Sequence, residues 1–208
     1  MVREKGLLIV LSGPSGVGKG VICNGLLGRN PNMKFSVSAT TRARRPGEVE
    51  GVNYFYKTRE EFLAMIENNE FLEYTEVFGA NFYGTPRAYV EQELMQGHDI
   101  ILDIDVEGAM NVKKAYPDAV SIFIAPPSMP ILKSRLIGRG TESEEAVERR
   151  FKTAFTEMKR IPEYDYVIVN DVIDRAVLSV EAILRGEKCS TRRNKDLIED
   201  LWKGCDLV

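Results

Sequence analysis

The chain has 208 residues, of which 44% are apolar and 28% charged, a composition that predicts one globular domain with a sizeable core. Its net charge of −3 argues against binding nucleic acid or an anionic membrane through a general basic field. The three cysteines lack the spacing of metal ligands, so we expect reduced thiols and a cytoplasmic location. No apolar stretch is long enough to span a membrane. The sequence leaves the oligomeric state open.

The first predicted element is a buried strand that leads into a glycine-rich turn. Residues 7–11 are all apolar, which is typical of a strand covered on both faces. Residues 13–19 then match the G-x-x-x-x-G-K pattern of a P-loop, whose backbone N–H groups and lysine bind the phosphates of a nucleoside triphosphate. A chance glycine-serine turn is the alternative. The candidate phosphate ligands are Gly13, Pro14, Ser15, Gly16, Val17, Gly18, Lys19 and Gly20.

The position after Lys19 departs from the P-loop pattern. It usually carries a serine or threonine whose hydroxyl binds Mg²⁺, whereas this chain has Gly20 followed by Val21. We therefore expect no direct protein ligand to the metal. Mg²⁺ is expected to be held by phosphate oxygens and water, with Asp103 or Asp105 reaching it through water.

A helix should follow the P-loop over residues 16–29, and residues 35–38 predict a short strand. The apolar side chains expected to face the sheet from this helix are Val21, Ile22, Leu26 and Leu27.

Residues 39–51 predict an irregular basic loop. Three arginines lie within four positions, and the stretch has too few apolar residues to build core. Taken alone, the loop could be merely solvated. The alternative is an anion-binding loop, because the planar guanidinium of arginine matches phosphate oxygens in a bidentate way.

Strand and helix patterns then alternate. Residues 53–56 are aromatic and β-prone, and Thr58 with Glu61 fits a capping box at the start of a helix. That helix should pack through Phe62, Met65 and Ile66, and residues 70–74 resume strand character.

A turn is expected over residues 79–84. Thr85 and Pro86 then predict the start of another helix, with Thr85 as its hydroxyl cap and Gly97 as its end. This succession is long for a simple crossover, so residues 37–90 predict an inserted subdomain.

The second half of the chain repeats strand and helix. Apolar runs predict buried strands over residues 99–105, 120–124 and 166–170, and such repeats predict a parallel sheet covered by helices on both faces. Asp103 and Asp105 should point the same way, at the strand end where open α/β sheets bind ligands.

The later helices carry clear boundary signals. Ser128 should cap one helix, the last packed helix should end at Gly186, and residues 187–208 should form a peripheral tail.

Two further arginines lie near a predicted helix break. Gly138, Arg139 and Gly140 interrupt the chain before an amphipathic helix over residues 143–160, on which Arg150 lies off the apolar stripe. The segment is either a solvated helix or a mobile element that closes cations over a site. Its expected stripe is Val147, Phe151, Phe155 and Met158.

A P-loop, a second arginine cluster and a mobile cationic segment together indicate phosphoryl transfer between two phosphate-bearing molecules. Such transfer depends mostly on positioning and electrostatic stabilisation. We find no Ser-His-Asp or Cys-His set, and His98, the single histidine, is interpreted as structural.

Seven segments resemble the guanylate kinase family, in order, within residues 6–185. They are 35–54 (FSVSATTRARRPGEVEGVNY), 69–73 (NEFLE), 82–85 (FYGT), 101–105 (ILDID), 124–127 (IAPP), 138–142 (GRGTE) and 167–171 (VIVND).

The resemblance implies an α/β P-loop kinase that converts ATP and GMP, and also dGMP, to ADP and the nucleoside diphosphate, with Mg²⁺, in purine metabolism and GMP recycling. It implies a core of about residues 1–36, 91–126 and 159–186, a GMP-binding subdomain at 37–90 and a helical lid at 127–158.

The resemblance also implies roles for individual residues. GMP would be bound by Ser38, Arg42, Arg45, Glu48, Tyr54, Glu73, Tyr83, Thr85 and Asp103. Lys19, Arg45, Arg139 and Arg150 would assist the transfer, with Arg149 and Arg135 as further candidates, and Asn170 would lie near the adenine.

Three other functions are alternatives to this one. A kinase of the same fold could use another phosphorylated acceptor, such as a sugar phosphate. A non-catalytic guanylate-kinase-like module could bind peptides, although such modules typically have degraded P-loops. An RNA-binding role for the arginine loop is disfavoured by the acidic net charge.

Overall fold

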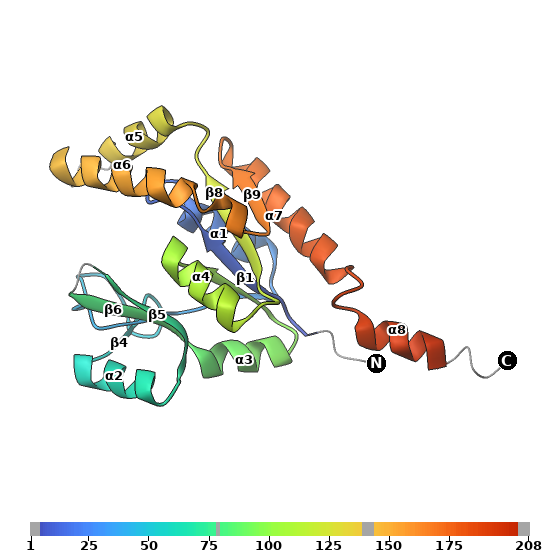
Figure 1. Cartoon of the computed structure of the whole chain (residues 1–208). Helices are drawn as coiled ribbons and strands as arrows, with labels where there is room; N and C mark the ends of the chain where they lie inside the picture. The colour runs from blue at the N-terminus through green and yellow to red at the C-terminus, as the bar shows by residue number, and fades with distance from the viewer. Residues whose placement is uncertain (1–4, 78–79, 139–143, 204–208) are drawn as a thin grey trace.

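The computed structural model describes residues 5–77, 80–138 and 144–203. Its larger sheet has five parallel strands in the order β2-β7-β1-β8-β9, which confirms the predicted parallel α/β sheet (Figure 1). These strands are β1 (Leu8–Ser12), β2 (Met33–Phe35), β7 (Asp99–Asp103), β8 (Val120–Ala125) and β9 (Tyr166–Val169).

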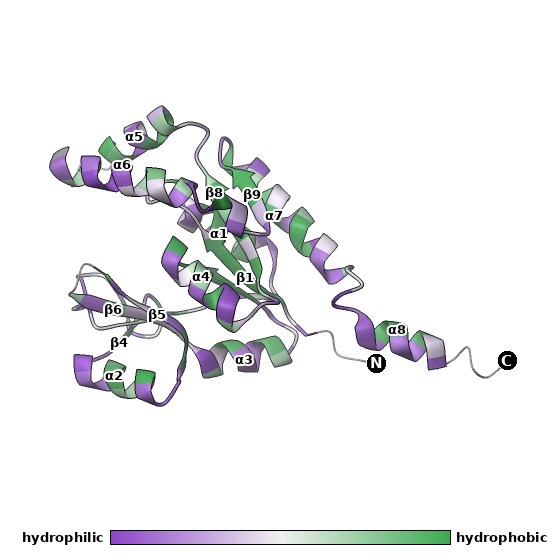
Figure 2. Cartoon of the chain, in the orientation of Figure 1, coloured by the Kyte–Doolittle hydropathy of each residue, from purple (hydrophilic) through white to green (hydrophobic). Residues whose placement is uncertain are grey.

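The central strand β1 is buried on both faces because helices cover each side of the sheet. Ile9 and Leu11 belong to one hydrophobic cluster, whereas Leu8 and Val10 belong to another, as the two-residue period of a strand requires. Figure 2 shows the apolar character of β1 and β8. Helices α1 (Lys19–Arg29) and α7 (Ile173–Lys188) contribute to the first cluster, and α3 (Arg87–Met95) and α4 (Val106–Ala115) to the second.

A separate mixed sheet has the strand order β4-β3-β6-β5, and helix α2 packs on it. Its core stacks Phe62 of α2 between Phe71 and Phe82, with ring centroids 4.4 and 5.3 Å from that of Phe62. Thr58 and Glu61 form the predicted capping box. The elements are β3 (Ala39–Thr40), β4 (Phe55–Tyr56), α2 (Arg59–Glu67), β5 (Phe71–Val77) and β6 (Asn81–Pro86).

Two helices, α5 (Met129–Ile137) and α6 (Glu144–Met158), pack on one another beyond β8, followed by the 3₁₀ turn η1 (Ile161–Glu163). Ser128 caps α5, as predicted. On α6 the expected stripe is only partly correct. Val147 is buried, but Phe155 is 57% exposed.

Several predicted boundaries were wrong. Helix α1 begins at Lys19, and Val21 is 51% exposed instead of facing the sheet. Of the expected strand at 35–38 only Phe35 lies in a strand, since β2 ends there and β3 of the other sheet begins at Ala39. The expected turn at 79–84 is mostly strand β6, and its first residue lies outside the described part of the chain.

Strand β9 was expected to be buried on both faces, and this was also wrong. It is the edge strand of the larger sheet, and Val167 and Val169 are about half exposed. An apolar run therefore does not distinguish an edge strand from a central one.

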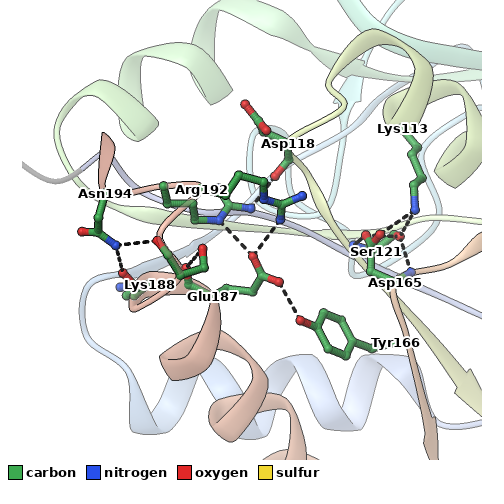
Figure 3. A network of polar contacts seen from close by, with 11 residues as sticks. Lys113, Asp118, Ser121, Asp165, Tyr166, Glu187, Lys188, Arg192 and Asn194 are labelled. Atoms are coloured by element: carbon green, nitrogen blue, oxygen red, sulfur yellow. Dashed lines mark hydrogen bonds and ion pairs between the residues drawn. The ribbon is translucent and has the colours of Figure 1, made fainter. Parts of the chain in front are cut away.

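The end of the chain is attached more firmly than a peripheral tail would be. Helix α7 continues past Gly186 to Lys188, so the predicted end at Gly186 was wrong. Glu187 accepts hydrogen bonds from the Tyr166 hydroxyl at 2.6 Å and from Arg192 and Arg193 at 3.0 Å each (Figure 3). These bonds attach residues 187–193 to β9.

Helix α8 (Lys195–Lys203) follows this anchored segment and has no buried residue. Leu197, Leu201 and Trp202 on it are more than half exposed. In Figure 1 it lies at the opposite end of the molecule from α5 and α6.

Replacing Glu187 with alanine is expected to lower the free energy of unfolding by about 2–4 kcal/mol, because the largely buried Arg193 and the Tyr166 hydroxyl would lose their shared acceptor. Urea unfolding measures this effect. Glu199→Ala on exposed α8 is the matched control and should change little. Equal stability of the two variants would show that the Glu187 contacts do not hold the chain end in place.

Candidate active site

The P-loop follows the carboxyl end of β1, and its glycines let the backbone turn sharply. Gly13, Gly16 and Gly18 have φ of 140°, 85° and 97°, which side chains other than that of glycine rarely allow. A Cβ at Gly13 would also lie 2.3 Å from the carbonyl oxygen of Ile124 on β8. The ammonium of Lys19 donates to the Gly13 carbonyl at 2.7 Å, so the lysine spans the opening of the loop.

Asp103 lies beside this lysine at the end of the neighbouring strand β7. Its carboxylate is 4.0 Å from the Lys19 ammonium. Burial raises the pKa of Asp103, and the positive charge of Lys19 opposes that rise. Asp105 was expected on the same strand as Asp103, but β7 ends at Asp103 and Asp105 lies beyond it. Instead Asp105 caps α4 by accepting the Gly108 N–H at 2.7 Å.

Asn170, the residue after β9, contacts the backbone of the P-loop. The Asn170 side chain is buried and donates to the Val17 carbonyl at 2.8 Å. Arg135 of α5 donates to the Val17 and Asn170 carbonyls at 3.4 and 3.1 Å. Asn170 was expected near an adenine, and the structure places its amide against the P-loop backbone.

The helices α5 and α6 bring a second predicted arginine, besides Arg135, to the P-loop. Arg150 donates to the Ser15 hydroxyl at 3.4 Å. Arg149 lies on the exposed part of α6. Arg139 lies outside the described residues.

Beside the mixed sheet, Glu48 is the residue on which side-chain contacts of the arginine loop meet. Its carboxylate accepts from Arg42 Nη2 at 2.7 Å, from the Arg45 backbone N–H at 2.8 Å and from the Tyr56 hydroxyl at 2.7 Å. Hydrogen bonds from Arg42, then Tyr56, then the Arg45 backbone lower the pKa of Glu48 to about 2, so it is charged at neutral pH. The guanidinium of Arg42 also lies over the Tyr54 ring, 5.3 Å from its centroid.

A cavity of about 290 Å³ opens between the two sheets. It brings together five of the predicted acceptor-site residues, Ser38, Tyr54, Glu73, Tyr83 and Asp103, and Asp105 also lines it.

Glu73 is the buried acid of this cavity. Its Oε1 accepts the Thr85 hydroxyl at 2.7 Å, so Thr85 does not cap α3 as predicted. Burial raises the pKa of Glu73 to about 7, a rise that the Thr85 hydrogen bond opposes. Near neutral pH this side chain can therefore be either charged or neutral.

Two side chains near the site were missed from the sequence. Tyr56 was interpreted only as a strand residue, and no local spacing links it to Glu48. Glu157 on α6 lies in the field of Lys19, and burial raises its pKa. Its spacing of seven residues from Arg150 places both on one helix face, a signal that could have identified it.

These features define a class of protein. A parallel α/β sheet carries a P-loop at the end of its central strand, and a second, polar cavity lies beside the P-loop lysine. This is the architecture of a P-loop kinase.

Comparisons with known proteins identify the family. A family model described as guanylate kinase matches residues 5–187. The chain is 55% identical over 200 residues to a guanylate kinase of Symbiobacterium thermophilum, covering 96% of this chain and 94% of that protein. It is 50% identical over 196 residues to one of Caldanaerobacter subterraneus subsp. tengcongensis, covering 94% and 95%.

Among solved structures, guanylate kinase from Anaplasma phagocytophilum matches with a TM-score of 0.76 and 39% identity, covering 96% of each chain. The chain belongs to the guanylate kinase family, and its function is that of a nucleoside monophosphate kinase.

Proposed function

We propose that this chain transfers the γ-phosphoryl group of ATP directly to GMP, with ATP on the P-loop and GMP in the neighbouring cavity. The observation that carries the proposal is the position of Asp103. Its carboxylate lies 4.0 Å from the P-loop lysine and also lines the cavity, so the two sites are adjacent. Two phosphate-bearing substrates could therefore meet without a covalent enzyme intermediate.

The arginine loop would bind the phosphate of GMP. Arg42 and Arg45 would supply positive charge, and the hydroxyls of Tyr54 and Tyr83 would donate hydrogen bonds. Glu48 would hold Arg42 in place rather than touch the phosphate, since its carboxylate is negative and already accepts three donors.

Glu73 would recognise the guanine base. The guanine edge offers two donors, N1–H and the exocyclic amine, which a carboxylate accepts together, whereas adenine N1 would repel it. Thr85 donates to Glu73 Oε1 and so fixes the carboxylate orientation. Ser38 and Asp103 would complete the polar lining, and dGMP is expected to bind in the same way.

Lys19 and the arginines of the lid would stabilise the phosphoryl group in transfer. We propose residues 127–158 as this lid, residues 37–90 as the GMP-binding subdomain and the remainder up to 186 as the core of a single domain. Arg150 already contacts Ser15 of the P-loop. Arg139 is proposed for the same task, and Arg45 for contact with both phosphates.

Mg²⁺ fits beside the P-loop, although no three His, Cys, Asp or Glu side chains are grouped as a metal site among the described residues. Asp103 lies there, and Gly20 leaves open space, because a Cβ at Gly20 would be 3.9 Å from Asp103 Oδ2. Bound Mg²⁺ would neutralise phosphate charge. Asp103 would hold it through water, with Asp105 as a second candidate.

Gly20→Ser is expected to lower the Mg²⁺ concentration for half-maximal activity by about tenfold, the scale on which a single contact changes metal affinity. The added hydroxyl would enter the open space beside Asp103. Gly20→Ala, which adds the carbon without the hydroxyl, is the control. Identical metal requirements in the two variants would contradict the idea that the missing hydroxyl weakens Mg²⁺ binding.

The cellular location is inferred from the helices and the cysteines. Within the described residues, none of the helices has the length and apolar character that a membrane span needs. We propose a cytoplasmic enzyme, which is consistent with its unpaired cysteines, Cys23 and Cys189, in the described part.

Release of ADP from ATP tests the proposed function, with GMP, dGMP, AMP and UMP compared as acceptors. GMP and dGMP should support turnover, and AMP and UMP should not. Comparable kcat/KM for GMP and AMP would contradict recognition by Glu73. Turnover with a sugar phosphate alone would assign a different acceptor, and no turnover with any acceptor would favour a binding module.

A further inference from the structure

Tyr56 connects the arginine loop to the mixed sheet through two hydrogen bonds. It lies on β4, which pairs with β3. Its hydroxyl donates to Glu48 Oε2 at 2.7 Å, and its backbone N–H donates to Glu50 Oε2 at 3.0 Å. A single residue of the sheet thus holds two carboxylates of the loop.

The loop, defined here as residues 42–52, has few other means of keeping its shape. None of its residues is buried, and its two valines, Val49 and Val52, are 49% and 64% exposed. Gly47 and Gly51 have positive φ, a conformation that favours glycine, and glycine has no side chain to pack. Polar contacts must therefore fix the loop.

Several of those polar contacts converge on Glu48. Its Oε1 pairs with Arg42, whereas its Oε2 accepts from Tyr56 and from the Arg45 backbone, and its carbonyl accepts from Arg44 Nε. The Tyr56 hydroxyl helps to set the rotation of this carboxylate. The orientation of the carboxylate in turn determines where the Arg42 guanidinium lies, which is over the Tyr54 ring.

We propose that Tyr56 is a positioning residue for the phosphate of GMP, acting through Glu48 on Arg42. The proposal rests on the proposed function, since it takes GMP as the acceptor. Tyr56 does not line the cavity. Its contribution is to keep the arginine loop in its binding conformation, so that GMP binding loses less free energy in ordering the loop. It should therefore affect GMP binding more than the transfer step.

The test compares Tyr56→Phe with Tyr74→Phe. Both variants lose one hydroxyl from a tyrosine of the mixed sheet, and Tyr74 on β5 is 44% exposed. Tyr56→Phe should raise KM for GMP by about tenfold, the effect of one hydrogen bond to a charged group, and should leave kcat and KM for ATP nearly unchanged. Tyr74→Phe should leave all three unchanged.

A double-mutant cycle with Glu48→Ala tests whether Tyr56 acts through Glu48. In the Glu48→Ala background the hydroxyl has no carboxylate left to orient, so Tyr56→Phe should add almost nothing to KM for GMP. A full additional increase would overturn the proposal. So would equal KM values for Tyr56→Phe and Tyr74→Phe, including the case in which Tyr56→Phe merely unfolds at a lower temperature.

Experiments on the wild-type chain distinguish failure of the role of Tyr56 from failure of the proposed function. Turnover of GMP by the wild type together with a normal KM in Tyr56→Phe would overturn the role of Tyr56 alone. Absence of GMP turnover and of GMP binding in the wild type would overturn the proposed function, and the role of Tyr56 with it.

Discussion

Replacement of Arg42 with alanine is expected to lower kcat/KM for GMP by at least about 100-fold, the scale of losing one preorganised electrostatic contact. Two effects add. The variant loses the guanidinium proposed to bind the phosphate, and it leaves the Glu48 carboxylate without its strongest partner. Even at the ordinary glutamate pKa of 4.5 that carboxylate is charged at neutral pH, so without Arg42 it would repel a phosphate.

Steady-state kinetics with GMP as the varied substrate measure this loss. Arg59→Ala is the matched control, since Arg59 belongs to the same subdomain but lies exposed on α2 and pairs with Glu76. Removing Glu48 as well should recover part of the activity lost in Arg42→Ala, because the repulsion disappears. Normal kinetics in Arg42→Ala would contradict the assignment of the phosphate site.

Replacement of Glu73 with glutamine is expected to lower kcat/KM for GMP by about 10³- to 10⁴-fold, since a site built to accept two hydrogen bonds loses one acceptor. The amide would present a donor to the guanine amine or N1–H. Activity with AMP should not fall. Equal losses for GMP and AMP would indicate a structural defect instead of lost base recognition.

The same substitution should stabilise the fold at alkaline pH. The pKa of Glu73 in the folded chain, about 7, lies above its ordinary value of 4.5, so the charged carboxylate is disfavoured in the fold. The wild type therefore loses stability between pH 4.5 and about 7, up to about 3 kcal/mol, and does not regain it above pH 7. Urea unfolding should show Glu73→Gln as the more stable protein at pH 8, with the difference disappearing near pH 5.

The titration of Glu73 also predicts how GMP binding depends on pH. Guanine needs the charged carboxylate, so KM for GMP in the wild type should rise as the pH falls below about 7. Glu73→Gln should lack this dependence. A pH-independent KM in the wild type would mean that the carboxylate is not the group that recognises the base.

Local patterns in the sequence were sufficient for much of the fold. Three local patterns each depend on a few neighbouring residues: the P-loop, the capping box at Thr58 and the cap at Ser128. The structure confirms that a helix follows each of them, namely α1, α2 and α5. The repeated apolar runs likewise predicted the parallel sheet. These features depend on short-range chemistry, which a single sequence contains.

The missed features depend on contacts between distant residues. Thr85 was interpreted as a helix cap, but its hydroxyl donates to a buried partner, Glu73, on the neighbouring strand β5. Gly186 did not end α7, because Glu187 beyond it is held by Tyr166 of β9 and by arginines of the chain end. The link from Tyr56 to Glu48 crosses from strand to loop in the same way.

A crystal structure of the chain with GMP bound tests the central claim most directly. We expect the guanine edge within hydrogen-bond distance of Glu73 and the phosphate on Arg42 and Arg45, with the P-loop left for ATP. A GMP phosphate seated on Lys19, or a cavity between Ser38, Glu73 and Tyr83 that GMP does not enter, would contradict the account.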